Sequence, residues 1–241
     1  MRKNKGRAKA HYFEKKEIAL WSISVLLILL SFCIFDRSRY LILLASIIGV
    51  TSLIFSAKAN PFGQFLMVLF SLLYGMISFT FSYYGEMATY LGMTAPMAVF
   101  SLISWMRNPY DANKAEVKIN RLSPKELIFM LLCAGAVTWI FYYILRYFHT
   151  ANLLPSTLSV TTSFLAVYLT FRRSPYYAIA YAANDIVLIV LWVLATLSDL
   201  TYFSVVICFV VFLINDLYGF FSWTKMQKRQ ESHPAPVHKA E

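Results

Sequence analysis

The residues best suited to hold a polar ligand are two Asn-Asp pairs, Asn184-Asp185 and Asn215-Asp216, each inside an apolar segment. The first pair interrupts AYAANDIVLIVLW, a stretch that is otherwise uncharged. A charged side chain at the centre of a membrane costs roughly 2.5–3.5 kcal/mol on insertion scales, and acids at such positions usually have a function. We therefore expect both pairs to contact a ligand or an ion. The alternative is mutual hydrogen bonding that joins helices.

Aromatic and hydroxyl residues accompany these pairs. At about 100° per residue of helix, Tyr177, Tyr181 and Asn184 fall within one narrow stripe. Flat rings beside amides and carboxylates suit a planar ligand that is neutral or carries one positive charge. Threonines on the preceding span can add ligand contacts, although such hydroxyls also serve close helix packing. The candidate substrate-binding residues are Asn184, Asp185, Tyr177, Tyr181, Trp192, Thr161, Thr162, Asn215, Asp216 and Tyr218.

Residue patterns for catalysis or metal binding are missing from the sequence. The three cysteines lie singly in separate apolar segments, and the four histidines lie in tails or at the end of a span. Neither HExxH, CxxC nor a phosphate-binding loop occurs, so we expect no metal, no cofactor, no catalytic residue and no direct coupling to ATP. An enzyme is therefore not expected.

The elements that must hold the candidate site are membrane-spanning helices. Hydrophobic residues make up 59% of the 241 residues and charged residues 14%, against about 45–50% and about 25% in soluble proteins. The sequence predicts an all-α multi-pass membrane protein, with a basic tail (1–16), a transmembrane domain (17–224) and a C-terminal tail (225–241). Its eight expected spans, each close to the about 17–25 residues that a bilayer requires, are 17–35, 40–57, 62–83, 88–106, 126–146, 155–171, 176–197 and 201–223.

The distribution of basic residues predicts the orientation of these spans. Nineteen of the 22 Lys and Arg residues fall on one side of the expected membrane, and only Arg37, Arg39 and Arg146 fall on the other. The positive-inside rule then predicts that both termini and the 107–125 loop are cytoplasmic. The net charge of +10 is explained by this orientation, so no nucleic-acid partner is expected.

Two similar sequence endings indicate an internal repeat. The fourth span ends in VFSLISWMRN and the eighth in LYGFFSWTKM, both with Ser-Trp before a basic flank. We interpret this as two parallel three-helix repeats, 40–106 and 155–224, joined by a linker helix at 126–146 and preceded by an extra N-terminal helix. The alternative is that Ser-Trp before a basic residue is a general interfacial anchor.

Three of these segments resemble the PnuC family of nicotinamide riboside transporters, whose architecture is similar to that of SWEET sugar transporters. They are SPYYAIAYAANDIVLIVLW, FFSWTKMQKRQ and MTAPMAVFSLISWMRNPY, and the resemblance covers about residues 40–229. Family members carry two tryptophans and, one turn later, an asparagine in the seventh span. Asn184 matches that asparagine and Tyr177 stands at the first tryptophan position. Ala180 stands at the second tryptophan position and departs from the family pattern. Tyr181, Tyr168 and Trp192 are the candidates to fill the space that the missing ring leaves.

The resemblance implies facilitated uptake of nicotinamide riboside across the cell membrane, with trapping by a separate cytoplasmic kinase on the way to NAD. Its partners are then a nucleoside-type vitamin and the lipid bilayer, while a homo-oligomer is left open. A related vitamin, thiamin or riboflavin, is the alternative substrate. The competing class is a membrane receptor or scaffold that does not transport.

Overall fold

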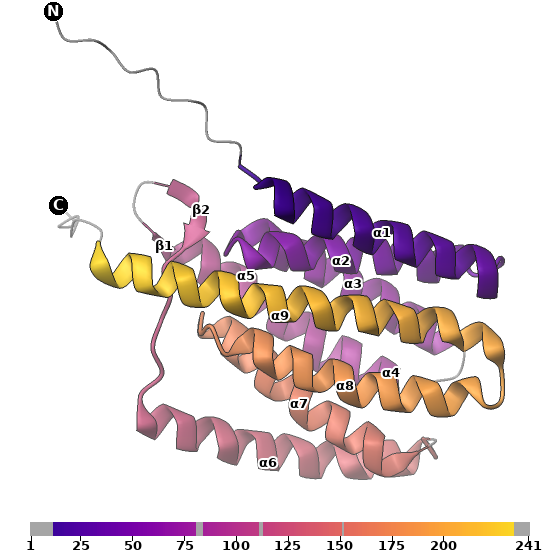
Figure 1. The fold of residues 1–241 in the computed structure, drawn as a ribbon. Helices are drawn as coiled ribbons and strands as arrows, with labels where there is room; N and C mark the ends of the chain where they lie inside the picture. Colours follow the sequence, from indigo (N-terminus) through magenta and orange to yellow (C-terminus); the bar gives the residue numbers. More distant parts are fainter. Residues whose placement is uncertain (1–11, 81–83, 111–112, 151, 234–241) are drawn as a thin grey trace, which may run out of the picture.

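The computed structural model of the protein describes residues 12–80, 84–110, 113–150 and 152–233, and parts of both predicted tails, 1–11 and 234–241, lie outside these ranges. Within them, eight spans are long and apolar enough to cross a membrane, as the sequence predicts. They lie side by side in one bundle (Figure 1). The spans are α1 (Lys15–Phe35), α2 (Tyr40–Ala57), α3 (Pro61–Thr80), Tyr84–Arg107, α6 (Pro124–Tyr147), α7 (Leu153–Phe171), α8 (Tyr177–Thr196) and Leu200–Ser232.

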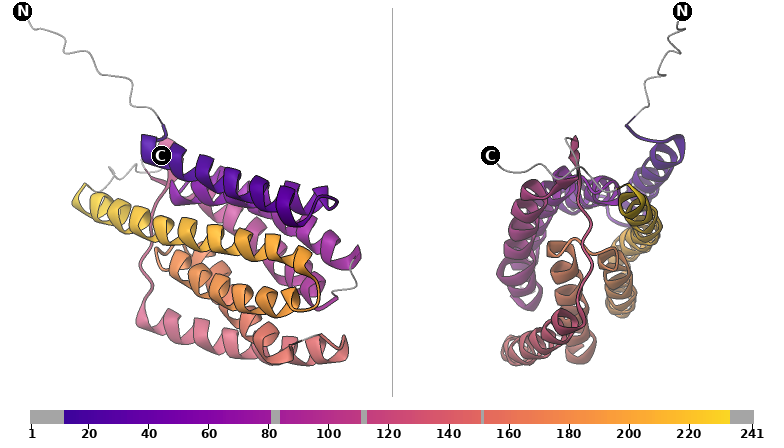
Figure 2. Two further views of the ribbon diagram at one scale, coloured as in Figure 1. Left: turned by 45° about the vertical axis from the view of Figure 1, so that its right-hand side comes forward. Right: turned by 90° about the vertical axis from the view of Figure 1, so that its left-hand side faces the viewer.

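Six of these spans form a closed ring. α7, α8 and α9 (Phe203–Ser232) follow one another around it, α9 packs against α2, α2 against α3, and α3 against α5 (Ala95–Arg107), which returns to α7. α1 packs outside α2 and α9, and α6 packs outside α7 (Figure 2). The buried core therefore lies between the ring helices, while α6 exposes Leu132 and Trp139 on its outer face, as a lipid-facing helix does.

The fourth span is broken by a π-helical turn. α4 (Tyr84–Thr89) continues through Tyr90–Thr94 into α5. Pro96 at the start of α5 has no N–H to donate to the preceding turn, which favours a local departure from α-helical bonding. The Thr94 hydroxyl donates to the Thr89 carbonyl across this turn, at 3.3 Å. Tyr90 and Thr94, at the two ends of the turn, both line internal cavities.

One end of the bundle carries a short two-stranded sheet, and we call it the hairpin end. β1 (Pro109–Tyr110) and β2 (Asn113–Val117) pair antiparallel next to the last turns of α9 (Figure 1). The buried Gln230 side chain donates to the Val117 carbonyl and accepts from the Ile119 N–H. α9 stays helical to Ser232 beside this sheet and passes the end predicted for the transmembrane domain at 224. The opposite end of the bundle is called the far end.

Two tryptophans close the hairpin end by reciprocal contacts. The Trp105 Nε1–H donates to the Thr170 carbonyl at 2.9 Å, and the Trp223 Nε1–H donates to the Ser56 carbonyl at 2.7 Å. Each preceding serine does the same, with Ser104 bonded to Phe171 and Ser222 bonded to Ala57. Both indole rings are fully buried, with centroids 5.3 Å apart. The last helix of each predicted repeat is thus bonded to the first helix of the other.

Replacing one of these indoles tests their contribution to stability. Trp223→Phe keeps a ring but removes the N–H donor and some packed volume, so we expect a loss of about 1–2 kcal/mol and a lower melting temperature in detergent. Trp139→Phe is the matched control, because Trp139 is 67% exposed on α6. An equal loss of stability in both variants would show that the burial and the N–H bond of Trp223 contribute nothing to stability.

Candidate functional site

Four of the ten predicted site residues, Tyr181, Asn184, Asp185 and Asp216, meet at a cavity of about 50 Å³ between the ring helices. This volume holds a few water molecules and is smaller than a nucleoside, so a ligand of that size requires side chains to move. Both predicted repeats contribute to its wall, and we call it the central cavity. Its lining includes Gly49, Leu53, Met67, Phe70, Tyr90, Thr94, Ser163, Val167, Tyr181, Asn184, Asp185, Leu188, Phe209, Phe212 and Asp216.

Asn184 is held in place by hydroxyl groups of α7. Its side-chain Oδ1 is within hydrogen-bonding distance of the hydroxyls of Ser159, Thr162 and Ser163, at 3.3, 2.8 and 3.0 Å. Its Nδ2 donates to none of the described residues although the side chain is buried. The asparagine, which lines the central cavity, therefore has an N–H group that no described residue accepts.

The second polar feature is a pair of carboxyl groups on neighbouring helices. Asp185 of α8 and Asp216 of α9 are 3% and 4% exposed, and both side chains line the central cavity. Neither carboxyl accepts a hydrogen bond from any other described residue. The pair is therefore an isolated acidic group in the wall of the cavity.

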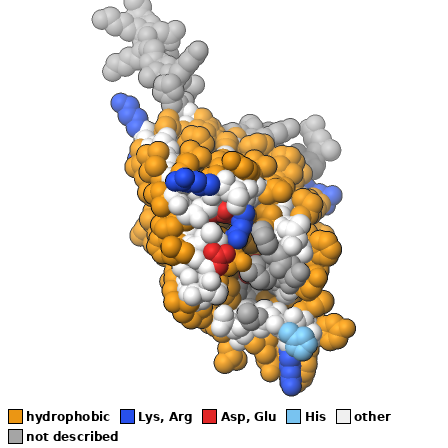
Figure 3. All heavy atoms as spheres, turned by 90° about the vertical axis from the view of Figure 1, so that its right-hand side faces the viewer, with side chains coloured by type: hydrophobic (Ala, Val, Ile, Leu, Met, Phe, Trp, Pro, Cys, Tyr) orange, Lys and Arg blue, Asp and Glu red, His pale blue; other side chains and the backbone are white. Residues whose placement is uncertain are grey.

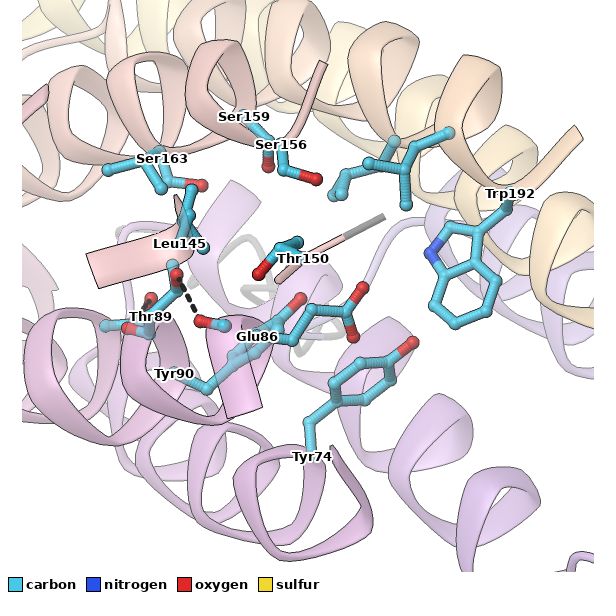
Figure 4. A pocket seen from close by; sticks show the side chains of 15 residues that line it. Tyr74, Glu86, Thr89, Tyr90, Leu145, Thr150, Ser156, Ser159, Ser163 and Trp192 are labelled. Atoms are coloured by element: carbon cyan, nitrogen blue, oxygen red, sulfur yellow. Dashed lines mark hydrogen bonds between the residues drawn. The ribbon is translucent and has the colours of Figure 1, made fainter. Parts of the chain in front are cut away.

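A further cavity of about 40 Å³ adjoins the central one toward the far end. The two share lining residues Tyr90, Thr94, Ser163 and Leu188. Polar side chains surround this second cavity, with Glu86 between Tyr74 and Thr150 and with Ser156 and Ser159 across from it (Figure 4). The Glu86 carboxylate also accepts from the Ser78 hydroxyl at 3.5 Å.

A wider opening of about 390 Å³ connects this second cavity to the far end. Glu86, Thr150, Ser156 and Trp192 line both spaces. Seen from the far end, charged side chains gather near the middle of the surface and hydrophobic side chains surround them (Figure 3). A row of polar spaces therefore leads from this surface to the Asp185–Asp216 pair, whereas buried indoles close the hairpin end.

Six of the ten predicted residues lie along this row of spaces or touch a residue that does. Asn184, Asp185, Asp216 and Tyr181 line the central cavity, and Trp192 lines the two spaces toward the far end. Thr162 is in contact with Asn184 rather than with the cavity itself. Which of them bind a ligand stays a prediction.

The other four predicted residues face elsewhere. The Tyr177 ring packs against Trp223 at the hairpin end, 4.8 Å between centroids, and Thr161 is hydrogen-bonded to Thr138 of α6. The Asn215 Nδ2 donates to the Ser24 hydroxyl of α1, and the Tyr218 hydroxyl donates to Glu17 of the same helix. These four side chains connect helices, and the structure gives them no contact with the central cavity.

Sequence reasoning missed several residues that line the cavities. Tyr90 and Thr94 belong to the π-helical turn, and Pro96 inside an apolar span was the signal for it. Glu86 was not among the candidate residues, yet it lines the second cavity. Ser159 and Ser163 stand one turn apart on α7 beside Thr162, and a stripe of three hydroxyls facing one asparagine was visible only after the helices were placed.

A family model described as nicotinamide mononucleotide transporter matches residues 39–225. The chain belongs to this family. The nicotinamide riboside transporter PnuC of Neisseria mucosa is 27% identical over 218 residues, 88% of this chain and 82% of that protein. The PnuC of Haemophilus influenzae is 22% identical over 191 residues, 79% of this chain and 81% of that protein.

The crystal structure of the vitamin B3 transporter PnuC has the same fold. Its TM-score is 0.77 at 22% identity, and the match covers 90% of this chain and 94% of that chain. Membership of the nicotinamide mononucleotide transporter family confirms the PnuC resemblance predicted from the sequence. It also confirms a multi-pass membrane transporter rather than an enzyme.

Cysteine labelling tests whether the row of polar spaces is open to reagents in water. In a background whose three native cysteines are replaced by alanine, Ser159→Cys should react with a small cationic methanethiosulfonate, and more slowly with an anionic one of similar size. The reason is that Glu86 and the Asp185–Asp216 pair line the route and attract positive charge.

Ser101→Cys is the matched control for that labelling. Ser101 is 1% exposed and lines none of the cavities described above. Protein in lipid nanodiscs gives the reagent access to both ends of the bundle. Equal labelling of the two variants, or no labelling of Ser159→Cys, would contradict a polar route into the site.

Proposed function

We propose that the protein is a carrier that takes up nicotinamide riboside, or a closely related cationic aromatic nucleoside, by facilitated diffusion. The observation that supports this most is the central cavity, in which an oriented amide and an acidic pair lie among aromatic side chains. The curated relatives of this chain are nicotinamide riboside transporters. A separate cytoplasmic kinase would retain the substrate after entry.

The chemistry of the cavity matches the parts of this ligand. Its pyridinium ring is flat and positively charged, and suits a site with the Tyr181, Tyr90 and Phe212 rings beside an acidic pair. Its carboxamide and ribose hydroxyls need hydrogen-bond partners, and the free Nδ2 of Asn184 is an oriented donor. Thiamin also carries a cationic ring and stays the second candidate, whereas riboflavin is neutral and makes no use of the acidic pair.

A carrier must open to each side of the membrane in turn. We propose that the described arrangement is closed at the hairpin end by Trp105, Trp223 and Tyr177, and that passage inward requires the reciprocal indole bonds to break. The charge bias supports a cytoplasmic hairpin end, with both termini inside the cell. A receptor that does not transport needs no row of polar spaces that ends at a breakable contact between indoles. This arrangement therefore favours a carrier over a receptor.

The proposed internal symmetry is consistent with this motion. α2, α3 and α4–α5 would form one repeat and α7, α8 and α9 the other, since α2 packs on α9 as α5 packs on α7. α1 and α6 then take similar places, because each precedes a repeat and packs outside its first helix. Repeats that are parallel and related by an axis along the membrane normal occur in other transporters.

Asn184→Leu tests the proposed substrate contact. The change removes the amide donor at nearly constant volume, so it should weaken nicotinamide riboside binding by about 1–3 kcal/mol. Some loss of stability is also expected, because three α7 hydroxyls lose an acceptor. The measurement is uptake of labelled nicotinamide riboside into proteoliposomes, together with the melting temperature.

Thr161→Val is the control for this experiment, because Thr161 faces α6 rather than Asn184. It should transport at the wild-type rate. Stoichiometric binding of labelled substrate without accumulation by the wild type would indicate a receptor. If Asn184→Leu transports normally and only its melting temperature falls, Asn184 is a structural contact between helices.

A further inference from the structure

The wider opening at the far end, which we call the far-end opening, is the space on the polar route that matches the size of a nucleoside site. Its volume is about 390 Å³, and pockets for small ligands measure about 300–1,000 Å³. The second and central cavities, at about 40 and 50 Å³, are too small for such a ligand until side chains move. A nucleoside that arrives from the far end therefore first meets a space that can hold it, and then two that cannot.

Two pairs of aromatic rings line the far-end opening. Trp192 of α8 and Tyr202, the residue before α9, have ring centroids 5.4 Å apart. Tyr84 at the start of α4 and Phe148, the residue after α6, have centroids 5.6 Å apart. Rings near a membrane surface also serve as interfacial anchors, but the Trp192 side chain is 6% exposed and lines the polar route. These rings offer stacking and cation–π contacts to a flat cationic ligand.

A charged pair holds Tyr202 in place. Arg39 and Asp199 are 3.4 Å apart, and the Arg39 guanidinium lies over the Tyr202 ring, 5.1 Å from its centre. Asp199 also accepts from the Thr201 N–H at 2.9 Å, where the turn Leu200–Tyr202 begins. The pair thus fixes the ring against which Trp192 packs, and its two charges balance each other.

Glu86 supplies the charge that attracts a cation. Its carboxylate and the Trp192 indole project into the second cavity from different helices (Figure 4), and both residues also line the far-end opening. The Ser78 hydroxyl donates to Glu86 at 3.5 Å, and no Lys or Arg of the described residues forms an ion pair with it. The described lining of the far-end opening holds one acid, Glu86, and one histidine, His149.

We propose that the far-end opening is a first binding site for the cationic aromatic substrate, in which the ligand ring lies against the Trp192 indole and the Glu86 carboxylate balances its charge. From there the ligand passes to the central cavity once the side chains between the two spaces move. The inference rests on the proposed function, because it uses the cationic ring of nicotinamide riboside. Two sites in series are compatible with facilitated diffusion, since neither of them requires a coupled ion.

Tryptophan fluorescence reports contact of the ligand ring with Trp192, because a pyridinium ring in contact with an excited indole quenches its emission. Nicotinamide riboside is titrated onto the full-length protein in lipid nanodiscs, and we expect saturable quenching in the wild type. Trp192→Phe keeps an aromatic ring but removes the fluorophore, so most of the saturable quenching should disappear. Trp139→Phe is the matched control, because Trp139 is exposed on the outer face of α6, and it should be quenched as the wild type is.

Two further variants separate the first site from the central one. Asn184→Leu removes the proposed contact in the central cavity, so uptake should fall while quenching still saturates at the wild-type concentration. Glu86→Gln keeps the shape of the side chain and removes its charge. The half-saturating concentration for quenching should then rise about two- to fivefold, as expected for an ion pair near water.

Several results would overturn the inference. Undiminished quenching in Trp192→Phe would show that the ligand does not contact this ring, and loss of quenching in Asn184→Leu would show that the ligand reaches Trp192 only from the central site. An unchanged half-saturating concentration in Glu86→Gln would remove the counter-charge. Uptake by the wild type without saturable quenching overturns this inference alone. The expected quenching without accumulation of labelled substrate in proteoliposomes supports the first site and contradicts the proposed transport.

Discussion

The hydrocarbon core of a bilayer cannot solvate a carboxyl group, so an acid such as Asp185 must face the interior of the bundle. Asp185 and Asp216 of the neighbouring helices α8 and α9 both face the central cavity. The adjacent asparagines then point in different directions. Asn184 faces the hydroxyls of α7, and Asn215 faces Ser24 of α1. The rotation of α8 and α9 that turns both acids inward thus determines which polar groups reach the cavity and which join helices.

The two ends of the bundle differ for a related reason. At the hairpin end the polar groups are saturated by each other: indole and serine donors bond to carbonyls at the ends of α2 and α7. Toward the far end, Glu86 and several hydroxyls surround open space instead. A carrier that is open to one side of the membrane at a time needs this asymmetry between its two ends. The π-helical turn places Tyr90 where it lines both cavities.

The eight spans could be predicted from the sequence, because the lengths of the apolar runs and the distribution of charge determine them directly. The depth and rotation of single residues could not. Tyr177 and Asn184 share a helical stripe, but that stripe runs along the helix, and Tyr177 lies at the hairpin end against Trp223. Asn215 and Asp216 differ by about 100° of rotation, and only packing against α1 decides which of them faces the cavity. Tyr90 and Thr94 depend on a local change of helix type that periodicity does not reveal.

The central claim is that the substrate is held at the cavity between α8 and α9. The most direct measurement is an experimental structure of the protein with nicotinamide riboside bound. We predict the pyridinium ring beside the Asp185–Asp216 pair, with Asn184 Nδ2 in hydrogen-bonding distance of the ligand and the rings of Tyr90 or Phe212 displaced to make room. Density for the ligand only in the far-end opening, or in the space between α1 and α9 lined by Glu17 and Tyr218, would contradict it.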